Sequence, residues 1–159
     1  GCGMNILKAK FLALTVQSNA LNWGFNPIDR WPRCDYLVAD EMEYRLALRN
    51  RTGDKADVLR KIQQRMGTRV AVMTLGHMGC LVADGDNIKE IPAFSREIVD
   101  TTGAGDAFLA FSSPFIRTGL PAELGAFIGS VAAAIHVGRL GNPSLLKDDL
   151  LSVIEKLLA

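Results

Sequence analysis

The chain has few cysteines and histidines, and none of them forms a pattern typical of a bridge or a metal site. Its three cysteines, Cys2, Cys34 and Cys80, are odd in number, widely spaced and free of any Cys-x-x-Cys. This argues against a disulfide framework and a zinc site, and it favours a reducing, cytoplasmic setting. The two histidines, His77 and His136, are far apart and form no metal-ligand pair.

Excess charge of one sign and long apolar runs are also missing. The 18 Lys and Arg residues against 17 Asp and Glu give a formal charge of +1. That balance gives no support to a nucleic-acid or acidic-membrane surface. No apolar run reaches the roughly 18 residues that a membrane span requires, and the run 11–16 is too short for a secretory signal. We therefore expect a cytoplasmic protein without a nucleic-acid or membrane partner.

Length and periodicity predict one α/β domain over residues 1–159. The chain has 159 residues, of which 48% are hydrophobic, which is enough for a real core. Gly1-Cys2-Gly3 stands ahead of Met4 and is compatible with a cloning remnant, so Cys2 supports no argument. Strand-like and helix-like runs alternate, which indicates a layered fold. The predicted strands are 11–16, 34–39, 69–75, 80–83 and 87–92, and the predicted helices are 40–48, 55–66, 106–117, 120–137 and 145–158.

Two local signals refine these elements. Asp84-Gly85 between two strand-like runs predicts a hairpin, and so an antiparallel edge on a mostly parallel sheet. Pro114 stands inside a predicted helix, where it removes a hydrogen bond, and we expect the helix to bend or to end early there.

The most informative stretch is the string DTTGAGD at residues 100–106, between a strand-like run that ends at Val99 and a helix that begins at Asp106. Gly103 and Gly105 let a ligand approach the backbone closely, and free N–H groups at a helix start favour anions. A carboxylate beside an anion suits a base that takes a proton from an attacking hydroxyl. Alternatively, Asp106 only offsets the unpaired N–H groups of the first helical turn.

The longer string DTTGAGDAF, residues 100–108, closely resembles the second signature of the ribokinase-like carbohydrate kinases of the PfkB type, and the resemblance extends from about residue 11 to residue 144. It implies a three-layer ribokinase-like α/β fold, with helices on both faces of the sheet, of which this chain is the C-terminal, nucleotide-binding portion. It also implies that the backbone of Gly103, Ala104 and Gly105 forms an anion hole and that Asp106 is the catalytic base. The implied reaction is ATP-dependent phosphorylation of a sugar hydroxyl, with Mg²⁺ and K⁺ as cofactors.

The resemblance also assigns nucleotide contacts to the turn after strand 69–75 and to helix 120–137 with the loop that follows it. From the residues alone, the small side chains of that helix suit close helix packing equally well, and His77 suits an exposed turn better than catalysis. The nucleotide contacts implied by resemblance are Thr74, Gly76, Gly129, Ala133, Gly138 and Gly141.

Cation sites are implied at two places. The family has an Asn-x-x-Glu motif that organises Mg²⁺ through water, and here Glu43 matches while Asp40 replaces the Asn. Without the family, acidic residues in a first helical turn need no function. A monovalent cation would be held by Asp100, Thr102 and Ser144, although the loop at 138–144 is one residue shorter than the usual pattern.

The sugar-binding half of such kinases has no counterpart in residues 1–10. We therefore expect the chain alone to be a poor catalyst, with the missing N-terminal half or a second copy as its partner. The expected substrate is a sugar or sugar phosphate, ahead of a nucleoside or vitamin. Loop 15–26 departs from ordinary ribokinase and is more similar to an uncharacterised branch of carbohydrate kinases. Its asparagines, Asn19, Asn22 and Asn26, suit turns better than ligand contacts.

Two other function classes compete with the kinase. The first is a non-catalytic nucleotide-binding or regulatory module, against which the presence of Asp106 argues. The second is a dinucleotide-binding domain, which we reject because DTTGAGD is not the Gly-x-Gly-x-x-Gly pattern and comes late in the chain.

Overall fold

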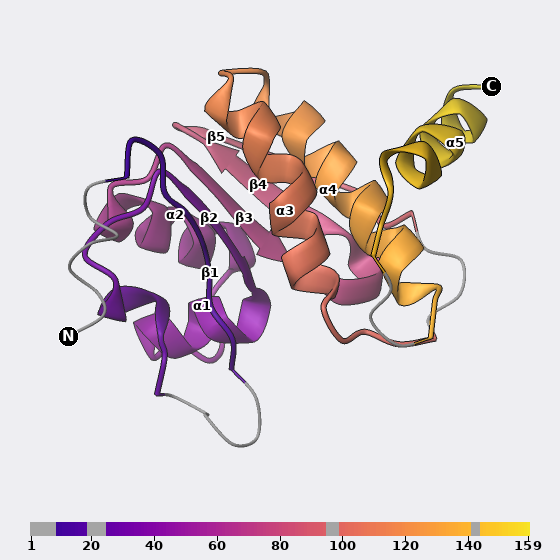
Figure 1. The fold of residues 1–159 in the computed structure, drawn as a ribbon. Coiled ribbons are helices and arrows are strands. Elements are labelled where there is room, and N and C mark those ends of the chain that lie inside the picture. Colours follow the sequence, from indigo (N-terminus) through magenta and orange to yellow (C-terminus); the bar gives the residue numbers. More distant parts are fainter. Residues whose placement is uncertain (1–8, 19–24, 95–98, 141–143) are drawn as a thin grey trace.

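A five-stranded sheet lies between two layers of helices in the computed structural model, which describes residues 9–18, 25–94, 99–140 and 144–159 (Figure 1). The strand order is β1-β2-β3-β4-β5. Strands β1, β2 and β3 pair in parallel, whereas β4 is antiparallel to both β3 and β5. The elements are β1 (Ala13–Thr15), η2 (Ile28–Arg30), β2 (Tyr36–Asp40), α1 (Glu41–Leu48), α2 (Lys55–Met66), β3 (Val70–Thr74), η3 (Gly76–Met78), β4 (Cys80–Asp84), β5 (Asn87–Ile91), α3 (Ala104–Arg117), α4 (Ala122–Val137) and α5 (Lys147–Leu158).

Alternation along the central strands builds a core on each face of the sheet. Successive strand residues point to opposite faces. Leu37 and Ala39 of β2 pack with α1 and α2 on one face, while Tyr36 and Val38 pack with α3 and α4 on the other (Figure 1). Helix α5 lies outside this sandwich, where Leu150 joins a third cluster with α4. The predicted three-layer α/β fold with an antiparallel hairpin is therefore confirmed.

The first two strands differ from their predicted bounds. Strand β1 covers only Ala13–Thr15, and β2 ends at Asp40 rather than Ala39. Leu12 and Asp35 already use their polar groups on each other, because the Asp35 carboxylate accepts from the Leu12 N–H at 2.7 Å and the Asp35 N–H donates to the Leu12 carbonyl at 2.8 Å. This contact replaces the ladder at the start of the pair, so regular pairing begins one residue later, at Ala13 and Tyr36.

Helix α3 begins at Ala104, two residues before the predicted start, and it does not end early at Pro114. Proline leaves the carbonyl of residue 110 without an N–H donor. Ala110 and Pro114 are both exposed, so solvent is available to that carbonyl and the helix continues to Arg117.

Two further predictions concern the segments before α3 and α5. Most of the run predicted as a strand ending at Val99 lies outside the described residues, and Val99 itself is in a bend, where its N–H donates to the Val137 carbonyl at 2.8 Å. Helix α5 begins at Lys147 rather than at residue 145, because Asp149 folds back to accept from the Leu146 N–H at 3.0 Å.

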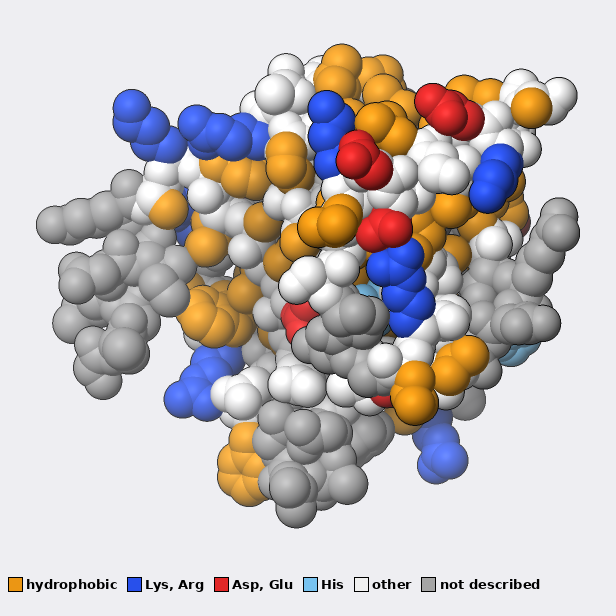
Figure 2. Space-filling model, turned by 45° about the vertical axis from the view of Figure 1, so that its right-hand side comes forward, with side chains coloured by type: hydrophobic (Ala, Val, Ile, Leu, Met, Phe, Trp, Pro, Cys, Tyr) orange, Lys and Arg blue, Asp and Glu red, His pale blue; other side chains and the backbone are white. Residues whose placement is uncertain are grey.

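The surface mixes charges of both signs. On the face shown in Figure 2, Lys and Arg side chains are interspersed with Asp and Glu, and neither sign forms a continuous patch. Among the described residues, no helix is long and apolar enough to cross a membrane.

Candidate active site

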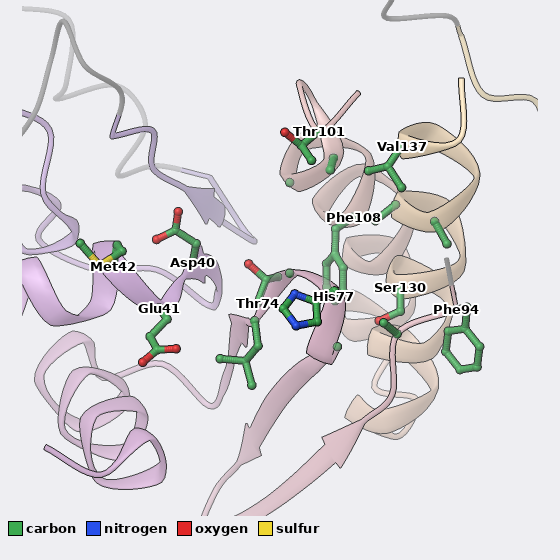
Figure 3. A pocket seen from close by; sticks show the side chains of 18 residues that line it. Asp40, Glu41, Met42, Thr74, His77, Phe94, Thr101, Phe108, Ser130 and Val137 are labelled. Atoms are coloured by element: carbon green, nitrogen blue, oxygen red, sulfur yellow. The ribbon is translucent and has the colours of Figure 1, made fainter. Parts of the chain in front are cut away.

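A cavity of about 540 Å³ lies at the carboxyl ends of β2 and β3. Such an edge is where open α/β sheets bind ligands. One wall carries polar groups from Asp40, at the end of β2, from Thr74, at the end of β3, and from His77, in η3. The opposite wall is mainly apolar and comes from α3, α4 and the segment after β5 (Figure 3). Phe94 and Phe108 are part of that wall.

The DTTGAGD turn forms the rim of this cavity. Thr101, Ala104 and Gly105 line it, and Gly103 precedes helix α3 with a φ of 81°, a left-handed angle that glycine adopts without strain. Within the described part of the chain, the N–H groups of Gly105 and Asp106 donate to no acceptor, whereas the Ala104 N–H donates to the Thr101 carbonyl at 3.3 Å. Two of the amides at this helix start are therefore available to an anion.

Asp106 lies in the first turn of α3, beside the cavity but not in its wall. The residue is exposed, and among the described residues it makes neither a hydrogen bond nor an ion pair. The Asp106 carboxylate lies close to the N–H groups of Gly105 and Asp106. It is therefore available to accept a proton from a ligand that binds beside these amides.

Glu43 and Asp40 form a capping box at the start of α1. One Glu43 oxygen accepts from the Asp40 N–H at 2.9 Å and the other from the Ser18 N–H at 2.8 Å. Glu43 is buried and does not line the cavity, and burial raises its pKa to about 7. Asp40 does line the cavity, and its Oδ1 accepts from the Glu43 N–H at 2.7 Å. Of these two acids, the one that lines the cavity is thus Asp40, the residue that departs from the motif expected by resemblance.

The structure brings together only some of the predicted nucleotide contacts. Thr74, Gly76 and Ala133 line the cavity, whereas Gly129 and Gly138 do not. A Cβ on Gly129 would lie 2.8 Å from the ring of Phe108, so this glycine makes room for α3 rather than for a ligand. Gly141 lies outside the described residues, as do Asn19 and Asn22.

The residues expected to hold a monovalent cation are only partly assembled. The Asp100 Oδ1 accepts from the Thr102 N–H at 2.9 Å, and the Thr102 carbonyl lies 2.8 Å from His136 Nε2. Ser144 is exposed ahead of α5. Among the described residues there is no group of three or more His, Cys, Asp or Glu side chains that could hold a metal ion.

Sequence reasoning missed several residues of the site. Phe108 could have been predicted from the sequence. It follows Gly105 by three residues, so both lie on the same face of the helix. Phe94, which also lines the cavity, and His136, which contacts the turn, come together only through packing. Ser130 also lines the cavity, on the helix 120–137 to which nucleotide contacts were assigned.

This chain is similar to known proteins in sequence and in fold. The profile described as pfkB family carbohydrate kinase matches residues 16–148. The chain belongs to the pfkB family of carbohydrate kinases. A 2-dehydro-3-deoxygalactonokinase of Haloferax volcanii is 34% identical over 120 residues, which cover 75% of this chain and 37% of that protein. A bifunctional protein HldE of Acidiphilium cryptum is 25% identical over 128 residues, which cover 79% of this chain and 26% of that protein.

The structural comparison confirms the ribokinase-like fold. The crystal structure of a ribokinase from Thermotoga maritima superposes with a TM-score of 0.67 at 26% identity, over 77% of this chain and 42% of that one. The pfkB chain described here thus spans well under half the length of these three relatives.

Proposed function

We propose that this chain supplies the nucleotide and phosphoryl-transfer site of an ATP-dependent kinase that acts on a hydroxyl of a sugar or a related small molecule. One observation carries the proposal: among the described residues, no group accepts from the N–H groups of Gly105 and Asp106 at the start of α3, and the neighbouring Asp106 carboxylate has no partner. An anion site alone has no use for that carboxylate, whereas phosphoryl transfer needs a base beside it. Membership of the pfkB family and relatives that are named as sugar kinases support the same reaction.

The cavity suits ATP in one orientation. The apolar wall that includes Phe94, Phe108 and Ala133 offers a surface for a flat purine ring. Thr74 and Gly76 lie at the end of β3, and Gly105 lies at the rim, so the phosphates would lie between them. In that orientation the terminal phosphate would lie at the start of α3, where backbone amides and the helix dipole stabilise negative charge.

The chemical step follows from these positions. The substrate hydroxyl oxygen attacks the γ-phosphorus, the bond from that phosphorus to the bridging oxygen breaks, and ADP leaves with the bonding electron pair. Asp106 accepts the hydroxyl proton, and the N–H groups of the turn stabilise charge on the phosphoryl oxygens. Because Asp106 lies outside the cavity wall, the sugar would approach from that side, which a part of such kinases not spanned by this chain would cover.

The residues present fit Mg²⁺ held mainly by phosphates and water. Mg²⁺ usually keeps several waters and binds one or two carboxylates, and Asp40 lines the cavity with Glu43 directly behind it. When bound, the ion would neutralise phosphate charge. Binding of K⁺ by Asp100, Thr102 and Ser144 stays a prediction. The Asp100 Oδ1 and the Thr102 carbonyl oxygen each already accept a hydrogen bond, so a cation would have to share these oxygens.

Replacement of the base tests the proposal. Asp106→Asn keeps the shape of the side chain but cannot accept the proton, so in the complete enzyme we expect sugar-dependent ATP turnover to fall roughly 10²–10⁴-fold. Binding of ATP to this chain, measured by calorimetry with Mg²⁺, should persist. Asp148→Asn is the matched control, since Asp148 is also an exposed acid in the first turn of a helix, α5, but is not part of the cavity wall.

Three outcomes separate the alternatives. Near-normal turnover of Asp106→Asn would contradict the base assignment. Tight ATP binding together with no turnover by the complete enzyme on any sugar, nucleoside or vitamin tested would favour the non-catalytic nucleotide-binding module. Absence of ATP binding by the folded chain would contradict both.

A further inference from the structure

His136 links helix α4 to the turn that would bind the phosphoryl group. Its side chain is buried, with 4% of the residue exposed, and Nε2 lies 2.8 Å from the carbonyl oxygen of Thr102. A carbonyl oxygen can only accept, so Nε2 must carry the proton in this contact. The helix around His136 is otherwise made of small and apolar residues, which makes a buried imidazole there conspicuous.

The contact between His136 and the Thr102 carbonyl also sets the direction of the Gly103 N–H group. A trans peptide unit is planar, and its C=O and N–H point in opposite directions. Fixing the Thr102 carbonyl toward His136 therefore fixes the Gly103 N–H away from α4. Gly103 has a φ of 81°, and the freedom of glycine makes rotation of this peptide easy unless an outside group holds it.

The next residue of α4 holds the preceding part of the turn. The Val137 carbonyl accepts from the Val99 N–H at 2.8 Å and from the Asp100 N–H at 3.1 Å. The segment before Gly103 is thus attached to the last turn of α4 by two residues, His136 and Val137. Val137 and Ala133 of the same helix also line the cavity, so one helix contacts both the proposed nucleotide pocket and the turn.

We propose that His136 is a positioning residue that orients the Thr102–Gly103 peptide, and with it the amides that bind the terminal phosphate. The proposal rests on the proposed function, in which those amides bind the terminal phosphate. It predicts that loss of the Nε2–H donor weakens recognition of the terminal phosphate while the pocket for the rest of the nucleotide is unchanged. A purely structural histidine would instead affect the binding of all nucleotides alike.

Paired substitutions separate the two roles. His136→Gln keeps an N–H donor at a similar reach, whereas His136→Met keeps the side-chain volume without the donor. Calorimetry on the folded chain compares Mg-ATP with AMP, which lacks the terminal phosphates. We expect His136→Met to weaken ATP binding by up to about tenfold, the upper end of what one typical hydrogen bond contributes, with AMP binding unchanged. His136→Gln should bind both nucleotides nearly as the natural chain does.

A measurement without nucleotide accompanies the binding assay. In ¹H–¹⁵N spectra of the chain, the Gly103 amide should shift or broaden in His136→Met and not in His136→Gln. Parallel loss of ATP and AMP binding, equal behaviour of the two variants, or an unchanged Gly103 resonance would each overturn the proposal. If the natural chain is folded but binds no ATP, the proposed function fails, and the spectra still report whether His136 orders the turn.

Discussion

At the scale of single residues, two carboxylates near the site differ because their surroundings differ. Glu43 is 6% exposed and accepts two backbone N–H groups, whereas Asp106 is exposed and has no partner among the described residues. The first side chain is fixed in one orientation and supports the end of β2. The second can move toward a substrate. A structural acid and a candidate base are therefore distinguished by environment rather than by residue type.

The protonation of Glu43 should make stability depend on pH. Burial is the main cause of its raised pKa of about 7, and it outweighs the two N–H groups that favour the charged form. Since the folded chain binds this proton more tightly than the unfolded chain, stability present at acidic pH is lost as pH rises from the unfolded pKa toward about 7. The pKa is measured by ¹³C NMR titration of the carboxyl group, and the stability by thermal unfolding from about pH 5 to pH 8.

Two variants control this prediction. Glu43→Gln should be less stable but should show a flatter dependence on pH, because it lacks the titrating group. Glu41→Gln should leave the slope unchanged, since hydrogen bonds to Arg45 and Lys55 oppose burial and hold the pKa of Glu41 below its usual value, outside this window. Titration of Glu43 near 4.5, its ordinary value, would contradict the assignment.

At the scale of elements, the position of α3 decides where the site residues lie, because this helix carries Gly105 and Asp106 at its start. Two contacts hold it. Phe108 packs over Gly129 of α4, and Ser112 donates to the Phe108 carbonyl at 2.7 Å while it accepts from the Tyr36 hydroxyl of β2 at 2.9 Å. Changes at these contacts are therefore expected to act on the site without touching it.

Gly129→Ala should destabilise the chain by about 1–3 kcal/mol, because the added methyl group overpacks against the Phe108 ring. Chemical denaturation measures the loss. Gly125→Ala on the same helix is the matched control, since its methyl group would meet the flexible end of Ile116 at 2.7 Å and the helix gains from alanine. An equal loss in both variants would show that Phe108 can shift as easily as Ile116.

The Tyr36–Ser112 pair should respond unequally to removal of its two hydroxyls. Ser112→Ala leaves the buried Tyr36 hydroxyl without its partner and should cost about 1–3 kcal/mol. Tyr36→Phe should cost less, because the Ser112 hydroxyl still donates to the Phe108 carbonyl. Denaturation of both variants and of the double variant measures the coupling, and a double variant much less stable than Ser112→Ala would contradict this account.

At the scale of the whole molecule, the described residues form a cavity at the carboxyl ends of β2 and β3, and Asp106 lies beside it. Strand β1 pairs only with β2, so its other edge has no strand partner in the described part of the chain. An unpaired edge is a surface on which further strands can add. This edge could therefore take up a further part of a longer kinase or a second copy, on which sugar binding is proposed to depend.

We expect the chain alone to bind Mg-ATP but to show no sugar-dependent turnover. Calorimetry and a coupled ADP-release assay over a panel of sugars measure the two activities separately. Sedimentation velocity at several concentrations identifies a homodimer. Sugar-dependent turnover by a monomer of this chain would overturn the expectation that a second half or copy is required.

The sequence by itself determined the family, the α/β class and the signature turn. The family followed from the resemblance of DTTGAGDAF to a known signature. Local rules were sufficient for the class and the turn, because strand alternation, the Asp84-Gly85 hairpin signal and the glycines of DTTGAGD act over a few neighbouring residues. Gly67 also ends α2 where predicted, with a left-handed φ of 60°.

Only the tertiary structure decided which predicted residues meet. It placed Gly129 under Phe108, put Asp40 rather than Glu43 on the cavity wall, and brought His136 to Thr102 across 34 positions of the chain. Contacts of this kind depend on how α3 and α4 pack on the sheet and on each other. A pattern of residues along one helix gives the direction of each side chain, but its partner is fixed by the neighbouring element.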